Sequence, residues 1–519
     1  MIRYKSIKQL SFEEFKTPFQ IHLDKGNRWV KLGDSLPWDE LAEIYYHGMD
    51  KTKGQPAVDA RIAIGALIVK HKLKLDDRET IETIRENVYI QYFLGLSQYT
   101  AEDVFDRSLF TALRYRMGAD KFDAMTLEII HRSEAKPGPA RQRTDKIEKQ
   151  NSGQHTGSPP QQRTQHLPNK GKLQMDATVA DQMIVFPTDL GLLAKSREES
   201  ERLIDALCEL LKEKQKPRTY RRKARQQYLE LAKKKTKSKR ALHKAIGQQI
   251  RYLKRNISSI EKLLDSKPGR FPLPFRDQQI YWVIQHIYAQ QKEMYDNHIH
   301  SIKDRIVNIY QPYVRPIVRG KDKAKVEFGA KLGVSLCDGY ARINTLSWDA
   351  YNESTDLKKQ VESFYQAHGH YPEVVLTDTI YGTRENRQWL KEHGIRYAGK
   401  ALGRPSCELK TAYQKRKYRK EQAMRNQIEG KFGQGKNGYN LNKIRARRAR
   451  TSESWIASIF FVMNLVRFSK DFLFSSLLYL IKGISLCVQS IKSGLSSGFQ
   501  KEKYHKPIVN RLNLIYLQF

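Results

Sequence analysis

The feature that most constrains this chain is a change of hydrophobic pattern near residue 172. Before about residue 138 the apolar residues recur at helical spacing, as in RIAIGALIVKHK from Arg61 to Lys72. From LQMDATVA onward, short apolar segments of strand length alternate with helical ones. The stretch between them has almost no apolar residues, so it cannot bury enough surface to offset its ordering entropy. The predicted organisation is a helical N-terminal domain (1–138), a flexible linker (139–171), a second domain that mixes strands and helices (172–470) and a tail without a readable role (471–519).

The order of elements after residue 172 predicts an α/β fold. LQMDATVA is expected to be the first strand, and two strands flank the hairpin-turn pair Asp338-Gly339. A helix leads to VVLTD, a buried strand that ends at Asp378, and IRYAG is expected to be a further strand. Strand, hairpin, helix, strand, helix, strand and helix follow one another as in an RNase-H-like core. A long helical insertion, at about 188–320, interrupts this core after its first strand.

The N-terminal domain carries signals for helix ends. Asp76 with Glu79 forms a capping-box pattern, and Thr100 with Asp103 repeats it before the helix that ends near Gly118. Short helices with basic ends suit docking on DNA, but a plain helical bundle fits the same pattern. Both interpretations of this domain stay open.

Charge narrows the choice of partner. Lys and Arg number 93 against 56 Asp and Glu, a formal net charge of +37. Self-repulsion of such an excess works against compaction, so a polyanionic partner is expected, with nucleic acid first and an anionic membrane surface second. No apolar run reaches the roughly 18 residues that a membrane-spanning helix requires. We therefore expect no membrane association and a cytoplasmic protein.

The insertion concentrates this charge. Between Lys212 and Arg255 it holds eighteen Lys or Arg and two acids, which favours contact with DNA phosphates. Lys233, Lys234 and Lys235 are the DNA-binding candidates there. The alternative is a solvated helical face that only keeps the protein soluble.

Other chemical motifs are sparse. The cysteines at 208, 337, 407 and 487 lie far apart and are expected to be small buried hydrophobes. The histidine pairs 298/300 and 368/370 have no further ligand at metal-binding spacing. No P-loop motif is present, so no nucleotide cofactor is expected.

Three acids stand out by their positions. Asp176 lies within the first predicted strand and Asp378 closes VVLTD, where open α/β sheets place their ligands. Glu429 lies between Lys410 and Arg450, a stretch of fourteen Lys or Arg with one other acid. Each alone fits a turn, cap or ion-pair role. Together they suit two Mg²⁺ or Mn²⁺ ions, which would stabilise the charge that builds up when a phosphodiester bond is cleaved.

The sequence around Glu429 supports this interpretation. Arg425 and Glu429 are four residues apart and share a helix face. Gly430, Gly433 and Gly435 are expected to end the helix and to let backbone approach a phosphate.

R-x3-E-x6-K, here Arg425, Glu429 and Lys436, resembles the signature around the third acid of DDE transposases from bacterial insertion sequences. TDTIYGTRENRQWLKEHGI and MDATVAD resemble the second-acid and first-acid blocks of that family. FKTPFQIHLDKGNRWVKLGDSLPWDEL and the segment around Arg61 are similar to the N-terminal domain of the InsH-like group, the insertion-sequence-five superfamily. One departure is Gln422, since the wider signature begins there with Tyr.

The resemblance implies a metal-dependent DNA transposase. Asp176, Asp378 and Glu429 would be catalytic and bind the two metal ions, while Arg425 and Lys436 would contact DNA near the scissile phosphate. The partners would be the terminal inverted repeats and target DNA, bound by a homodimer or larger assembly. Two rivals remain on sequence alone: an RNase-H-like nuclease that cuts without joining, and a non-catalytic basic nucleic-acid-binding protein.

Overall fold

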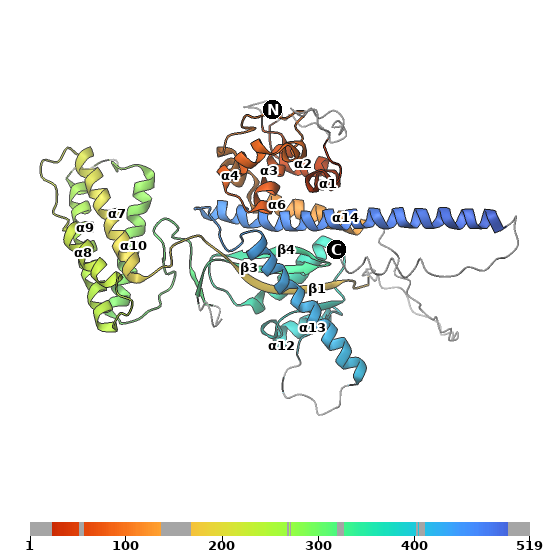
Figure 1. Ribbon diagram of the computed structural model, residues 1–519. Helices are drawn as coiled ribbons and strands as arrows, with labels where there is room; N and C mark the ends of the chain where they lie inside the picture. The colour runs from red at the N-terminus through yellow and green to blue at the C-terminus, as the bar shows by residue number, and fades with distance from the viewer. Residues whose placement is uncertain are drawn as a thin grey trace, which may run out of the picture.

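The computed structural model describes residues 23–50, 57–135, 168–266, 269, 271–318, 326–400, 403 and 411–496. In Figure 1 a group of N-terminal helices lies on one side of the long helix α14 and a β-sheet lies on its other side. A separate bundle of helices stands apart from the sheet (Figure 1). The predicted linker is outside the described residues except for 168–171.

The N-terminal helices form where the sequence supplies caps. The capping box predicted at Asp76 and Glu79 is confirmed, and α6 breaks at Gly118, whose φ of 62° is non-helical. The second predicted box is wrong. The backbone N–H and C=O of Thr100 both bond to the buried side chain of Gln91, and α6 begins later, at Ser108. The helices are α1 (Arg28–Ser35), α2 (Trp38–Tyr46), α3 (Ala60–Leu73), α4 (Asp77–Glu86), α5 (Val88–Phe93) and α6 (Ser108–Ala135).

Within the described part of the chain, the sheet has six strands in the order β2-β3-β1-β5-β6, with β4 also paired to β3. β3 is antiparallel to β1 and β4, whereas β5 is parallel to both β1 and β6. The predicted hairpin is present, since Asp338 and Gly339 have φ of 49° and 90° and join β3 to β4. The strands are β1 (Lys172–Asp181), β2 (Pro316–Val318), β3 (Val326–Cys337), β4 (Tyr340–Ser347), β5 (Val374–Leu376) and β6 (Arg396–Tyr397).

Helices cover both faces of this sheet. One face packs against α11 (Asp356–His368) and α12 (Arg384–Glu392), with Leu173 and Met175 of β1 in their shared core. The other face meets α13 (Ala412–Gly433) and α14 (Ala449–Ser496). Residues two apart on a strand share a face, so Gln174 and Asp176 point toward α13.

The largest hydrophobic core joins the N-terminal helices to the sheet. Side chains from α1–α6, from β3 and β4 and from α14 belong to one buried cluster. α14 is the element between them, and it runs without interruption through residue 470, where the predicted tail begins. Among the described residues, no helix combines the length and apolarity that crossing a bilayer requires.

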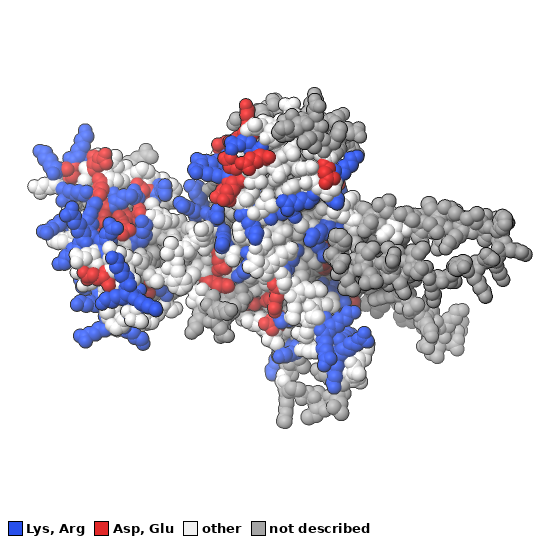
Figure 2. All heavy atoms as spheres, viewed as in Figure 1, with Lys and Arg blue, Asp and Glu red and all other residues white. Residues whose placement is uncertain are grey.

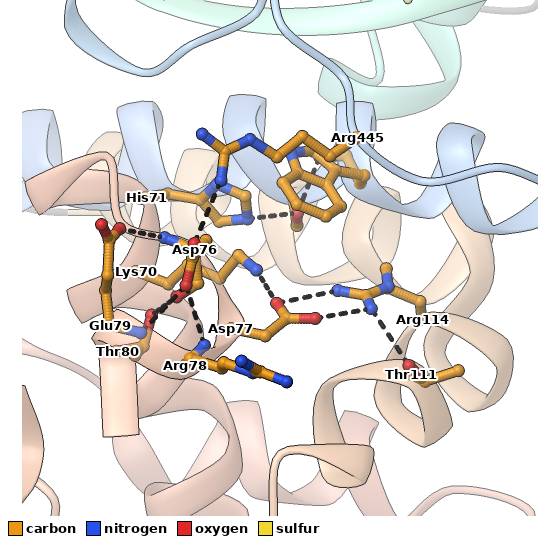
Figure 3. A network of polar contacts seen from close by, with 12 residues as sticks. Lys70, His71, Asp76, Asp77, Arg78, Glu79, Thr80, Thr111, Arg114 and Arg445 are labelled. Carbon is orange, nitrogen blue, oxygen red and sulfur yellow. Dashed lines mark hydrogen bonds and ion pairs between the residues drawn. The ribbon is translucent and has the colours of Figure 1, made fainter. Parts of the chain in front are cut away.

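Buried polar groups reinforce this junction (Figure 3). Asp77 of α4 pairs with Lys70 of α3 and with Arg114 of α6, the latter at 3.0 Å. Both cations lie over the indole of Trp455 in α14, at 4.2 and 5.0 Å from its centroid. His71 bonds to Ser458 at 2.8 Å, and burial lowers the pKa of His71 to about 3. The network therefore ties three N-terminal helices to α14.

The predicted helical insertion is a bundle with a core of its own. It comprises α7 (Asp189–Leu210), α8 (Arg221–Ala232), α9 (Lys239–Asp265) and α10 (Phe275–Asp296). In the sequence, the bundle begins after β1 and ends before β2. Figure 2 shows Lys and Arg spread densely over its visible face.

Candidate functional site

Asp176 and Asp378 lie on neighbouring parallel strands. Gln174 of β1 pairs with Leu376 of β5, and continuing that register by two residues places Asp176 level with Asp378. Adjacent strands are about 4.8 Å apart, so Asp176 and Asp378 lie next to each other across the β1–β5 pair. Asp378 follows the end of β5, and its side chain accepts the Thr379 N–H at 2.6 Å as the N-cap of a short 3₁₀ turn.

Glu429 is brought to the same region by α13. This helix crosses the face of β1 that carries Asp176, and Gln427 accepts a hydrogen bond from Gln174 at 3.1 Å. Glu429 is two residues beyond Gln427, so its side chain points away from the side of the helix that contacts Gln174. The helix therefore lies across β1, while the Glu429 side chain is exposed at its surface.

Arg425 links two of the three acids. Its guanidinium lies 3.3 Å from Glu429 and 4.0 Å from Asp378. The two carboxylate side chains are more than half exposed, at 58% for Asp378 and 57% for Glu429, whereas Arg425 is 21% exposed. A single guanidinium thus offsets the repulsion between two carboxylates that come from different elements.

The donor set of this cluster suits a hard divalent cation, because all its ligand atoms would be carboxylate oxygens. The carboxylates of Asp378 and Glu429 are open to solvent, so an ion can reach them. Within the described ranges, no three His, Cys, Asp or Glu side chains are grouped closely enough to form a metal site. The acids therefore fit a divalent cation in their chemistry, but their carboxylates are not gathered into one three-ligand group, and Arg425 lies between Asp378 and Glu429.

The segment after Asp378 is fixed by buried polar contacts. Asn386 donates to the carbonyls of Tyr381 and Ser354 at 2.9 and 2.8 Å. Tyr381 is fully buried, and its pKa is raised by burial and by the nearby charges of Glu353 and Asp176. Tyr381 and Asn386 both belong to the block TDTIYGTRENRQWLKEHGI, and their contacts hold the turn that follows Asp378.

Two further acids near this segment were missed in the sequence. Glu353 pairs with Lys331 at 3.0 Å, and Asp356 is buried, with one oxygen accepting from Thr345 at 3.1 Å. Both precede or begin α11, where acids are ordinary helix-start residues, so the sequence carries no signal that separates them from caps.

Lys436 lies away from the three acids. Its ammonium is 3.3 Å from Glu327 and 3.7 Å from Asp181, at the far end of β1. Asp181 is five residues beyond Asp176, which corresponds to about 16 Å along a strand. The structure therefore brings Arg425, but not Lys436, to the acids.

The glycines after Glu429 mark the end of α13, as expected. Gly430 lies in its last turn, Gly433 is its last residue, and a π-helical segment, Gln434–Gly438, follows it. A Cβ at either Gly430 or Gly433 would meet no atom within 4 Å, so both face open space. They still leave room for close approach of a ligand.

Lys233, Lys234 and Lys235 lie on the connection between α8 and α9, at the surface of the bundle. Residues 233–240 include six cations, all exposed, and none of the six is ion-paired to another described residue. Lys239 and Arg240 stand in the first turn of α9, where the helix dipole already contributes positive charge. This end of the bundle is therefore suited to anions.

Two family models match separate parts of the chain. One is described as a transposase DDE domain and covers residues 375–466, which include Asp378, Arg425, Glu429 and Lys436. The other is described as a transposase domain, DUF772, and covers residues 18–116. The first match spans β5 to α14 and the second spans most of the N-terminal helices.

A curated relative from Rhizobium meliloti, "Uncharacterized protein ORF8 in nfe locus", is 34% identical over 89 residues. That stretch is 17% of this chain and 42% of the relative, so the chain spans less than half of the relative's length. No solved structure matches the chain.

The two family matches make the chain similar to transposases in two separate regions, the N-terminal helices and the part of the sheet domain that carries Asp378 and Glu429. More narrowly, the predicted resemblance to the DDE transposases is confirmed by the match that contains the second and third acids. Membership of the InsH-like group stays a prediction.

Proposed function

We propose that the chain is a DNA transposase that cleaves phosphodiester bonds at element ends and joins the 3′-hydroxyl to target DNA. The support is the convergence of Asp378 and Glu429 on Arg425, beside the strand that carries Asp176. We further propose that the sheet is an RNase-H-like core. Its strand succession β4-β3-β1-β5-β6, with β3 antiparallel to its neighbours, supports that assignment.

In this proposal Asp176, Asp378 and Glu429 hold two Mg²⁺ or Mn²⁺ ions. When bound, the ions supply charge stabilisation for the attacking and leaving oxygens of the phosphodiester. The β1–β5 register, continued by two residues, sets Asp176 level with Asp378, and Arg425 of α13 lies between Asp378 and Glu429. Asn386 and Tyr381 hold the turn that orients Asp378.

Arg425 has two roles in this site. Its guanidinium keeps the carboxylates of Asp378 and Glu429 side by side, and its remaining donors can bind a phosphate oxygen. Lys436 contributes at a distance, by holding the ends of β1 and β3 through Asp181 and Glu327. The sequence-based role of Lys436 at the scissile phosphate is therefore replaced by a structural one.

The basic bundle is proposed to grip the DNA backbone. Lys233, Lys234 and Lys235 are exposed and unpaired with described acids, so their charges are available to phosphates. Terminal inverted repeats and target DNA would be the partners, and a homodimer or larger assembly would bring two element ends together.

A plasmid-cleavage assay tests the proposal. Wild type should nick or linearise supercoiled DNA that carries the element ends in Mg²⁺ and should be inactive in chelator. Glu429→Gln should lose at least about a hundredfold in rate, since a lost metal ligand removes several kcal/mol of transition-state stabilisation. Glu421→Gln is the matched control, because Glu421 lies on the same helix but pairs with Arg396 at 2.6 Å. Cleavage in chelator, or an active Glu429→Gln protein, would contradict the proposal.

A further inference from the structure

The first nine residues of α13, 412–420, have no buried side chain. The buried side chains of this helix are Ile428, Lys431 and Phe432, all in its second half. Residues 412–420 are exposed except for the half-buried Tyr418. Figure 1 shows this half extending beyond the sheet as a projecting helix. We call residues 412–421 the α13 arm.

The arm carries a charge that its own sequence cannot balance. Five of the six residues from 415 to 420 are Lys or Arg, and the blue surface at the lower end of the molecule in Figure 2 corresponds to them. None of the five is ion-paired to a described acid, and Glu421, the acid of the arm, pairs with Arg396. Like charges four apart, as at Lys415/Arg419 and Arg416/Lys420, destabilise a helix. A bound polyanion would offset this repulsion and stabilise the helix.

The arm is in line with the candidate site. Lys415, Arg419, Gln422, Asn426 and Glu429 share one face of α13, because the last four follow the first by four, seven, eleven and fourteen residues. All five are exposed except Gln422, which is half-buried. Fourteen residues of helix span about 21 Å, which equals the rise of about six base pairs of duplex DNA.

We propose that this face, the Lys415 track, binds the DNA backbone next to the reacting phosphate and guides it for about six base pairs. Lys415 and Arg419 neutralise phosphates, while the side-chain amides of Gln422 and Asn426 donate hydrogen bonds to phosphate or sugar oxygens. The inference rests on the proposed function, because it takes Glu429 as the point at which the strand is cut.

A pair of double variants tests the track. Lys415→Gln/Arg419→Gln removes two charges from the face that carries Glu429. Lys417→Gln/Lys420→Gln removes two charges from the other side of the same arm and leaves the track intact. Both pairs keep helix-compatible side chains, and circular dichroism verifies that each protein is folded.

Binding to a duplex with an element end is measured in chelator, so that no cleavage is required. The track variant should flatten the dependence of log K on log salt by about 2, which corresponds to two lost phosphate contacts. It should also lose footprint protection over about six base pairs beside the cleavage position. The matched variant should keep the footprint. Equal effects of the two variants, or an unchanged footprint in the track variant, would overturn the proposal.

These outcomes separate the track from the activity. A wild-type protein that binds with the predicted footprint but does not cleave would refute the proposed function and leave the track in place. If the protein cleaves DNA but its footprint is unchanged in Lys415→Gln/Arg419→Gln, the track is refuted and the proposed function stands.

Discussion

The charges buried between the N-terminal helices and α14 allow a quantitative stability test. Asp77 is the carboxylate that neutralises Lys70 and Arg114, whose side chains are only 1% and 11% exposed. Asp77→Asn leaves both cations with little besides the Trp455 ring face to offset their desolvation. Breaking a buried pair in this way costs about 3–5 kcal/mol, so we expect a loss of that size in the free energy of unfolding.

Adding Lys70→Met to Asp77→Asn should restore part of that loss. The double variant removes one of the two uncompensated charges and keeps an apolar side chain of similar volume against Trp455 and Phe110. Lys70→Met alone should cost less than Asp77→Asn, because Asp77 still pairs with Arg114.

Asp77 and Lys70 also determine how the free energy of unfolding depends on pH. The pKa of Asp77 is lowered despite burial, through Arg114 and Lys70, so its contribution is complete at neutral pH and is lost as pH falls through the folded-state value. Burial lowers the pKa of Lys70 from 10.5 to about 8, so the unfolded chain binds more protons between these values. Stability should therefore rise with pH from about 8 to about 10, by up to about 3 kcal/mol from this group. Lys70→Met should lack that rise.

Urea unfolding of the four proteins, wild type, both single variants and the double variant, gives the coupling energy directly. Each series is repeated at pH 7 and pH 9.5. An Asp77→Asn protein within about 1 kcal/mol of wild type would refute the assignment of a buried, neutralised cluster. A Lys70→Met protein with the wild-type pH dependence would refute the role of Lys70.

Three further predictions concern DNA binding, metal choice and packing. Replacing Lys233, Lys234 and Lys235 with alanine should weaken binding to all DNA sequences alike and flatten the salt dependence by up to about 3 in slope; wild-type binding across a salt titration would favour a merely solvated bundle. Ca²⁺ should support assembly on DNA without efficient cleavage, whereas Mg²⁺ and Mn²⁺ support both, as gel-shift and cleavage assays would report; full cleavage in Ca²⁺ would rule out the proposed site. Gly329→Ala should destabilise the β1–β3 pairing by about 3 kcal/mol, because a Cβ there would lie 1.9 Å from the carbonyl oxygen of Ala180. Gly430→Ala, with no atom near the new Cβ, should be neutral or stabilising in thermal melts, and similar losses in both variants would contradict the packing argument.

Local patterns predicted the order of elements well. β1, the β3–β4 hairpin, α11, β5, α12, β6 and α13 all occur where hydrophobic period and turn residues place them. The helical insertion is equally evident, because its amphipathic helices need only one another to form a core. These features depend on residues close together in sequence.

Contacts between distant segments were less predictable. The spacing of Arg425 and Glu429 implies a shared helix face, but nothing in it implies that Arg425 also reaches Asp378. The same limitation affects Lys436, whose partners Asp181 and Glu327 come from two strands separated by the insertion. At Thr100 a capping pattern was present, but Gln91 takes the backbone groups that the cap would have organised.

The shared core is the other feature that no local pattern contains. α14 is one continuous helix. From the sequence, its apolar residues could equally belong to a helical bundle, to a separate tail or to a helix that connects two domains. Only the fold shows that side chains such as Phe461 contact the N-terminal helices and belong to the core that includes β3 and β4.

The central claim is that Asp176, Asp378 and Glu429 act together on DNA. Its most direct test is strand transfer, in which a labelled, pre-cut element end with a free 3′-hydroxyl is incubated with target plasmid in Mg²⁺. Wild type should yield joined product, while Asp176→Asn, Asp378→Asn and Glu429→Gln should each bind the end but yield none. Joined product from any one of the three variants at a rate near that of wild type would contradict the account.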